Sequence, residues 1–296
     1  MDRKDFIKTT VLGVAGSVAG SRVQREQSST STFDRLAEGT DYQDQLGYNH
    51  IPNKEIRTMK TVLHKADTRG LADHGWLQSR HTFSFANYRN PDRMNFGVLR
   101  VLNDDVVAGG KGFGTHPHDN MEIVSIPLSG DLEHKDSMGN VAVIRKGDVQ
   151  VMSAGTGIYH SEYNGSQQEE VRFLQIWMFP NRKNVTPRYD QITLDETKLT
   201  NQLHQILSPT ADDDGVMVHQ QSWWHMASFD KDTAISYELH QPSNGVYAFV
   251  LEGQLQVGEQ ELHTRDGYGM WDTQQIDILG RAGSKLLLME VPMQLS

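Results

Sequence analysis

The stretch that decides the fold runs from Gly110 to Asn164 and reads GKGFGTHPHDNMEIVSIPLSGDLEHKDSMGNVAVIRKGDVQVMSAGTGIYHSEYN. It contains His116-Pro117-His118 and His160-Ser161-Glu162, and in each piece two potential metal ligands stand two residues apart. On a β-strand, residues i and i+2 point to the same face. If the two strands face each other across a barrel, three imidazoles and one carboxylate converge. The stretch therefore predicts a metal site.

The remainder of the chain also predicts short strands. Brief apolar runs separated by turn residues are typical of an all-β barrel or sandwich. The expected strands cover residues 61–64, 96–102, 121–128, 132–134, 141–144, 149–152 and 172–179. Residues 103–105, 137–140 and 146–148 are predicted turns, and Asp195 to Gln205 is the best helix candidate.

A weak internal repeat predicts a second barrel. Leu128 to Leu132 (LSGDL) resembles Leu251 to Leu255 (LEGQL). The positions that would correspond to the two histidines of the first copy hold Leu239 and Gln241. We therefore expect the second barrel to bind no metal.

Composition excludes several classes of protein. The 296 residues carry a formal net charge of −10 and include no cysteine. The negative charge gives no electrostatic reason to expect binding to nucleic acid. Without cysteine there are no disulfides, thiolate ligands or cysteine nucleophiles. We expect a monomer without a stable membrane anchor.

The N-terminus has the pattern of an export signal. Residues 2–8 (DRKDFIK) resemble a twin-arginine signal in which Lys4 replaces the second arginine, and the apolar stretch from Thr9 to Gly20 follows. That stretch is too short to span a bilayer. Residues 1–20 are therefore a predicted signal peptide, and residues 21–58 are a predicted polar linker. The expected location is periplasmic or exported if the signal functions, and cytoplasmic otherwise.

The motifs then identify a family resemblance. Residues 110–130 and 147–164 resemble the two cupin motifs, and Met59 to Leu295 resembles the pirin family, especially bacterial pirin-like quercetin 2,3-dioxygenases. The segments that carry the likeness are HGWL (74–77), HTFSFANY (81–88), LRVLNDD (99–105), GFGTHPH (112–118), DSMGN (136–140), MSAGTGIYHSEYN (152–164), QIW (175–177) and TPRY (186–189). This resemblance implies a bicupin, which is two double-stranded β-helix barrels, with a metal-binding cupin over residues 59–183 and a metal-free cupin over residues 184–296.

The resemblance also implies the ligands of the metal. They are His116, His118, His160 and Glu162. Many cupins use the carboxylate of the first motif, here Glu122, and strand parity alone does not exclude it; the pirin pattern favours Glu162. Three imidazoles and one carboxylate leave one or two open positions on a six-coordinate ion, which suits catalysis better than a closed structural site. The family implies Fe(II), while Mn, Ni, Co, Cu and Zn remain alternatives.

The activity implied by the resemblance is dioxygenation of a flavonol such as quercetin by O2, with release of carbon monoxide. Glu162 would accept the proton of the substrate hydroxyl. The expected apolar pocket is lined by Phe83, Phe85, Phe113, Met152 and Trp177. Two alternatives stay open: a non-enzymatic, redox-sensing module that binds other proteins, and a different cupin reaction on an unknown substrate.

Overall fold

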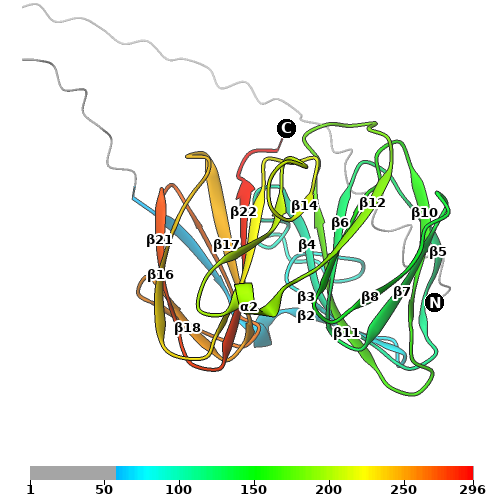
Figure 1. The fold of residues 1–296 in the computed structure, drawn as a ribbon, viewed down its shortest axis with the longest axis horizontal. Helices are drawn as coiled ribbons and strands as arrows, with labels where there is room; N and C mark the ends of the chain where they lie inside the picture. The colour runs from blue at the N-terminus through cyan, green and yellow to red at the C-terminus, as the bar shows by residue number, and fades with distance from the viewer. Residues whose placement is uncertain (1–57, 296) are drawn as a thin grey trace, which may run out of the picture.

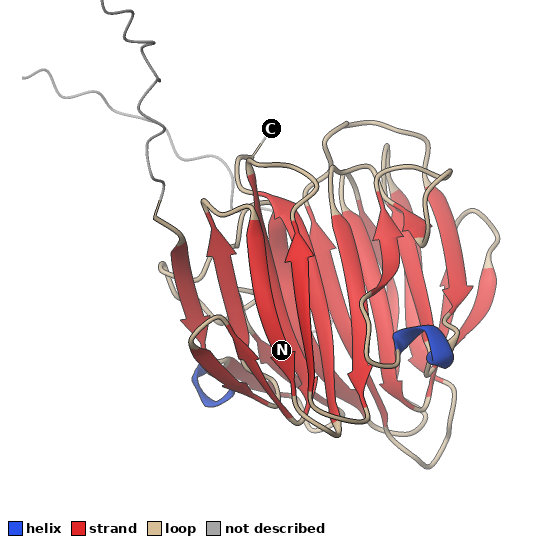
Figure 2. Cartoon of the chain, turned by 60° about the vertical axis from the view of Figure 1, so that its left-hand side comes forward, coloured by secondary structure: helices blue, strands red, loops and turns tan. Residues whose placement is uncertain are grey.

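Residues 58–295, which the computed structural model describes, form four β-sheets arranged as two barrels (Figures 1 and 2). The first barrel contains β2 (Gly70–Asp73), β3 (Leu77–His81), β4 (Leu99–Val107), β5 (Gly112–His118), β6 (Glu122–Ser129), β7 (Asp131–Asp136), β8 (Val141–Arg145), β9 (Asp148–Ser153), β10 (Ile158–Asn164), β11 (Val171–Met178) and β12 (Arg188–Thr193). The second contains β1 (Lys60–His64), β13 (His204–Ser208), β14 (Val216–Met217), β15 (Trp223–Phe229), β16 (Thr233–Glu238), β17 (Asn244–Glu252), β18 (Gln254–Val257), β19 (Gln260–His263), β20 (Gly267–Trp271), β21 (Gln275–Gly280) and β22 (Ser284–Pro292). The helical segments are η1 (Ala66–Thr68) and α2 (Glu196–Leu199). The predicted all-β bicupin is confirmed.

Each barrel consists of one seven-stranded and one four-stranded sheet. In the first barrel the strand orders are β12-β9-β6-β11-β4-β3-β2 and β5-β10-β7-β8. In the second they are β1-β20-β17-β22-β15-β13-β14 and β16-β21-β18-β19. Within the described residues, no helix has the length and apolar character that a membrane crossing needs.

The two barrels share one hydrophobic core. Val124 and Leu174 of the first barrel belong to the same buried cluster as Trp224, Tyr247 and Phe249 of the second. Successive residues of a strand point to opposite faces. Each seven-stranded sheet therefore has one face in this shared core and the other in its own barrel interior.

One strand, β1, is contributed to the second barrel from the far end of the sequence. β1 comes from the N-terminal side of the chain, yet Lys60 to His64 pair with Gly267 to Trp271 of β20 in the second barrel. Figure 1 shows this blue strand beside the orange and red strands. β12 follows the first barrel's motifs in sequence and pairs with β9 of that barrel, from Arg188 opposite Ser153 to Thr193 opposite Asp148. β12 thus lies beyond the predicted division between residues 183 and 184, and that division stays a prediction.

The predicted repeat corresponds to equivalent turns. Gly130 separates β6 from β7, and Gly253 separates β17 from β18. Both glycines have positive φ angles, 72° and 76°. This left-handed conformation costs little at glycine because it has no Cβ. The same short sequence therefore makes the same turn in each barrel.

Two local predictions were wrong. Residues 103–105 are not a turn but the middle of β4, paired with β3 and β11. The strand tolerates its charges because Asp104, on the face toward the second barrel, accepts hydrogen bonds from Arg69 and Arg265. The predicted helix over 195–205 is limited to α2, which Asp195 caps by accepting a hydrogen bond from the Thr197 amide. The chain then enters β13, where tertiary pairing with β15 outweighs helix propensity.

The N-terminal predictions cannot be compared with the fold. The predicted signal peptide over residues 1–20 and residues 21–57 of the predicted linker lie outside the described residues.

Candidate metal centre and cavity

The two histidine motifs lie on neighbouring strands of one sheet. β5 and β10 are hydrogen-bonded to each other, with His116 directly opposite His160 and His118 opposite Ile158. The expectation that the strands face each other across the barrel was therefore wrong. Convergence has a simpler cause: side chains directly opposite on antiparallel strands have Cβ atoms about 5 Å apart.

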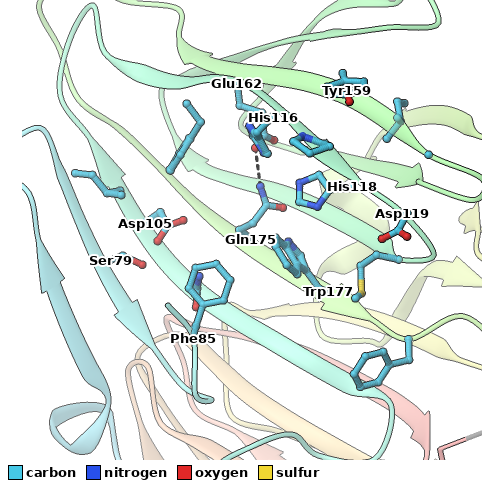
Figure 3. Close-up of a pocket in the computed structure, with 18 of the residues that line it drawn as sticks. Ser79, Phe85, Asp105, His116, His118, Asp119, Tyr159, Glu162, Gln175 and Trp177 are labelled. Atoms are coloured by element: carbon cyan, nitrogen blue, oxygen red, sulfur yellow. Dashed lines mark hydrogen bonds between the residues drawn. The ribbon is translucent and has the colours of Figure 1, made fainter. Parts of the chain in front are cut away.

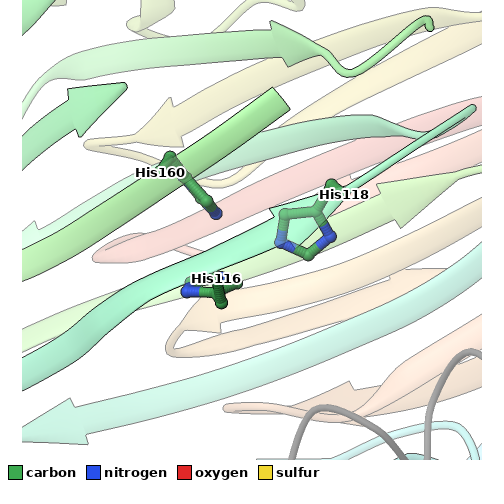
Figure 4. A group of neighbouring side chains, drawn as sticks. All are labelled: His116, His118 and His160. Atoms are coloured by element: carbon green, nitrogen blue, oxygen red, sulfur yellow. The ribbon is translucent and has the colours of Figure 1, made fainter. Parts of the chain in front are cut away.

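Three imidazoles meet at this point of the sheet (Figure 4). The ring centroids of His116 and His160 are 4.4 Å apart, and each of these rings lies 4.9 Å from that of His118. One ring nitrogen from each residue falls in a group whose members all lie within 4.8 Å of one another. The structure thus brings together the three histidines predicted from the sequence.

Burial favours the neutral form of two of these imidazoles, those of His118 and His160. Burial lowers the pKa of His118 to about 3, with His116 adding to the effect, and burial also lowers the pKa of His160 well below its ordinary value. His160 is only 2% exposed, and neither of its ring nitrogens has a hydrogen-bond partner among the described residues. The Nδ1 of His116 lies 2.8 Å from the Gly114 carbonyl oxygen, to which it donates in the tautomer that leaves Nε2 free.

Glu162 lies beside His160 on the barrel side of the site. Its two carboxylate oxygens accept hydrogen bonds from Ser125 Oγ at 3.1 Å and from Gln175 Nε2 at 2.8 Å. The register of β5 and β10 shifts between His160 and Glu162. Glu162 therefore lies opposite Phe113, and not opposite the residue that the pairing of His160 with His116 would predict. These contacts keep the carboxylate oriented next to the imidazoles.

A fourth histidine joins the cluster from β7. His134 is the register partner of Glu162, and with His160 and Glu162 it forms a second group of potential ligand atoms within 4.8 Å of one another. Its Nε2 lies 3.3 Å from Asp136 Oδ2, and the ring centroid lies 4.8 Å from that of Tyr189. The sequence analysis missed this residue. The signal was alternation along β7, where Leu132, His134 and Asp136 share one buried face.

Glu122, the alternative carboxylate ligand, lies elsewhere. It accepts hydrogen bonds from Ser153 Oγ at 2.7 Å and from the His219 amide at 3.2 Å. β5 and β6 belong to different sheets. Alternation counted from His116 therefore does not predict the direction in which the Glu122 side chain points. Glu122 shares the β6 face of Val124, which packs toward the second barrel. Burial raises the pKa of the Glu122 carboxyl, in keeping with its place in this interface.

A cavity of about 710 Å³ opens beside the imidazoles. His116, His118 and Glu162 are in its wall (Figure 3). Of the five predicted lining residues, Phe85, Phe113 and Trp177 line it. Phe83 and Met152 belong instead to hydrophobic clusters.

The donor set fits a divalent transition metal. Neutral imidazole nitrogens and a carboxylate oxygen suit iron, nickel, copper and zinc. The unpartnered nitrogens of buried His160 would be costly if they met no ligand. Among residues 58–295, both groups of potential ligands lie in the first barrel, and together they give it the character of a metal-binding cupin.

Comparisons with known proteins agree with this architecture. The sequence matches the family described as Pirin over residues 56–178 and the quercetinase C-terminal cupin domain over residues 205–291. A protein of Escherichia coli named quercetin 2,3-dioxygenase is 44% identical over 230 residues, which cover 78% of this chain and 98% of that protein. A pirin-like protein of Caulobacter vibrioides is 36% identical over 225 residues, covering 76% of this chain and 96% of that protein.

Solved structures show the same likeness. The crystal structure of YhhW from Escherichia coli superposes with a TM-score of 0.76 at 42% identity, covering 80% of this chain and 100% of that one. A second structure, of the bacterial pirin YhhW in complex with nickel(II), gives a TM-score of 0.75 at 42% identity and covers 79% and 99% of the two chains. The chain belongs to the pirin family of bicupin proteins.

Proposed function

We propose that the chain is a metal-dependent dioxygenase that cleaves quercetin or a related flavonol with O2 and releases carbon monoxide. The observation that carries this proposal is the meeting of His116, His118 and His160, of which His116 and His118 line a largely apolar cavity. The names of the curated relatives support the reaction class. A cavity of about 710 Å³ favours a small aromatic substrate over a protein partner.

We propose that His116, His118, His160 and Glu162 hold the metal and that the ion is Fe(II). Mn, Ni, Co, Cu and Zn suit the same donors. The nickel(II) complex of YhhW supports a divalent ion at this type of site. When bound, the ion supplies Lewis acidity toward a substrate hydroxyl and one-electron chemistry toward dioxygen.

In this proposal the side chains of the cavity orient the substrate and accept its proton. The carboxylate of Glu162, held by Ser125 and Gln175, takes the proton of the flavonol's enolic hydroxyl. Phe85 and Trp177, whose ring centroids lie 5.4 Å apart, present apolar surfaces to the flat substrate and exclude water. Overall, two carbon–carbon bonds break, both atoms of dioxygen enter the ring-opened product, and the carbon between those bonds leaves as carbon monoxide.

The proposal is tested by adding quercetin and oxygen to the Fe(II)-loaded protein and measuring carbon monoxide, with Glu162→Ala alongside. Loss of the proton acceptor is expected to lower the rate by about 100-fold. Glu238→Gln, an exposed carboxylate of β16, is the matched control and retains the parent rate. Absence of carbon monoxide from fully loaded parent protein would rule out quercetin cleavage by the iron form.

We also propose that the first 20 residues direct export through the twin-arginine route. The support is Arg3 and Lys4 before an apolar stretch, together with a family match that begins only at residue 56. In a bacterial host, fractionation is expected to place the mature protein in the periplasm with its N-terminus near Ala19 to Ser21. Replacing Arg3 and Lys4 with glutamine is expected to retain the uncleaved chain in the cytoplasm; export of that variant would contradict the proposal.

A further inference from the structure

A second polar group lies on the cavity wall contributed by β3 and β4. Ser79 and Asp105 are register partners on these strands, and Asn103 lies two residues from Asp105 on the same strand. All three line the cavity that also contains His116 and His118. They are 2%, 4% and 3% exposed, in that order. This polar group is therefore built into the barrel interior.

The three side chains offer buried oxygen atoms to the cavity. Within the described part of the chain, Asn103 Oδ1 and Asp105 Oδ1 have no hydrogen-bond partner. Ser79 Oγ also has no partner at hydrogen-bond geometry, although its hydroxyl is near enough to the Asp105 carboxyl to favour that group's charged form. A buried oxygen left without a partner costs free energy, and natural proteins rarely keep one without a reason. Since carboxylate and amide oxygens accept hydrogen bonds, the missing partner is a group that donates them.

The spacing of the strands suits two donors on one ring. Directly opposite side chains such as Ser79 and Asp105 have Cβ atoms about 5 Å apart, so their oxygens can meet neighbouring hydroxyls of one aromatic ring. Apolar residues form the surrounding wall, including Leu77, Phe85 and Trp177. A flat ring can pack against these side chains while its hydroxyls point at the polar group.

Gln175 links this wall to the metal centre. It is the register partner of Asn103 on β11, and its Nε2 donates to Glu162. In Figure 3 it is drawn between Asp105 on one side and His118 on the other. One elongated ligand can therefore contact the polar group and the imidazoles at the same time.

We propose that Ser79 and Asp105 form a hydroxyl-binding subsite that selects polyhydroxylated aromatic substrates. The subsite takes phenolic hydroxyls remote from the oxygens that reach the metal centre. This inference rests on the proposed function, because it assumes that a flavonol enters the cavity. It adds which hydroxyls of the substrate are recognised and which side chains recognise them.

The test is equilibrium binding without oxygen, so that no turnover occurs. The Fe(II)-loaded parent is titrated with quercetin and with 3-hydroxyflavone, which lacks the remote hydroxyls. The parent is expected to bind quercetin more tightly, and the ratio of the two dissociation constants measures the subsite. Ser79→Ala and Asp105→Leu are each expected to lower that ratio about tenfold. Asp105→Asn keeps one acceptor oxygen and is expected to lower it less.

A matched control variant and two distinct outcomes separate failure of the subsite from failure of the proposed function. Asp277→Asn, an exposed carboxylate of β21, is expected to keep the parent's ratio. Thermal unfolding of each variant checks that it folds. If the parent binds both flavonols alike, or if the ratio survives in the variants, the subsite is overturned while the proposed function stands. If neither flavonol binds the loaded parent, the subsite and the proposed function are both overturned.

Discussion

Replacing His160 with alanine is expected to remove the metal and to lower carbon monoxide release by at least about a thousandfold. His160 belongs to both groups of potential ligand atoms, so its loss breaks the group with His116 and His118 and also the group with His134 and Glu162. Removal of any member other than His160 breaks only one of the two groups and leaves the other complete. Metal content per chain, measured by mass spectrometry, checks the first effect, and gas release checks the second.

The control for His160→Ala is a histidine of similar burial in the other barrel. His225 of β15 is 8% exposed, and its Nδ1 has no hydrogen-bond partner within residues 58–295. His225→Ala is expected to keep the metal and the activity, whatever it does to stability. A full complement of metal in His160→Ala would show that the centre is held by other residues.

Exchanging Asp105 for asparagine is expected to change how stability depends on pH. Burial raises the pKa of the Asp105 carboxyl from 3.8 to about 7, and the charges of Asp104 and Glu162 raise it while the Ser79 hydroxyl opposes the shift. Below about pH 4 the carboxyl is protonated in both folded and unfolded chains. Between about pH 4 and 7 the unfolded chain releases the proton and the folded chain keeps it, so the parent loses stability as pH rises. Above about pH 7 the full penalty, about 4 kcal/mol, is present.

The measurement compares the parent and Asp105→Asn by denaturant unfolding at several pH values. Because the two proteins share every other titrating group, the difference in their free energies of unfolding isolates Asp105. The free energy of unfolding of Asp105→Asn is expected to rise relative to that of the parent as pH increases from 4. The difference is expected to level off above pH 7. Parallel curves across this range would show that the carboxyl titrates alike in both states.

The parts of the fold that follow local rules could be predicted from the sequence. Alternation and turn residues locate most strands, and the spacing in His116-Pro117-His118 and His160-Ser161-Glu162 predicts side chains on one face. These features depend only on residues close together in the chain. The order of strands in a sheet depends on residues far apart in the chain. That order places β5 beside β10 in one sheet, and not across the barrel from it.

Residues that depend on long-range pairing were missed for the same reason. His134 becomes part of the site only because β7 pairs with β10. Asn103 and Asp105 resemble turn residues in isolation, and their place inside a strand follows from pairing on both sides. Strand parity did not exclude Glu122 from the site, but the change of sheet after β5 places it in the contact between the barrels.

The contribution of β1 to the second barrel has a consequence for how this chain can evolve. β1 is the edge strand of the second barrel's seven-stranded sheet, although it precedes the whole first barrel in the sequence. A gene cut between the barrels would leave the second half without β1 and expose the edge of β20, and an unpaired edge is a known route to aggregation. The barrel without the histidine cluster therefore cannot be shuffled as an independent module, because its last edge strand is encoded on the far side of the other barrel.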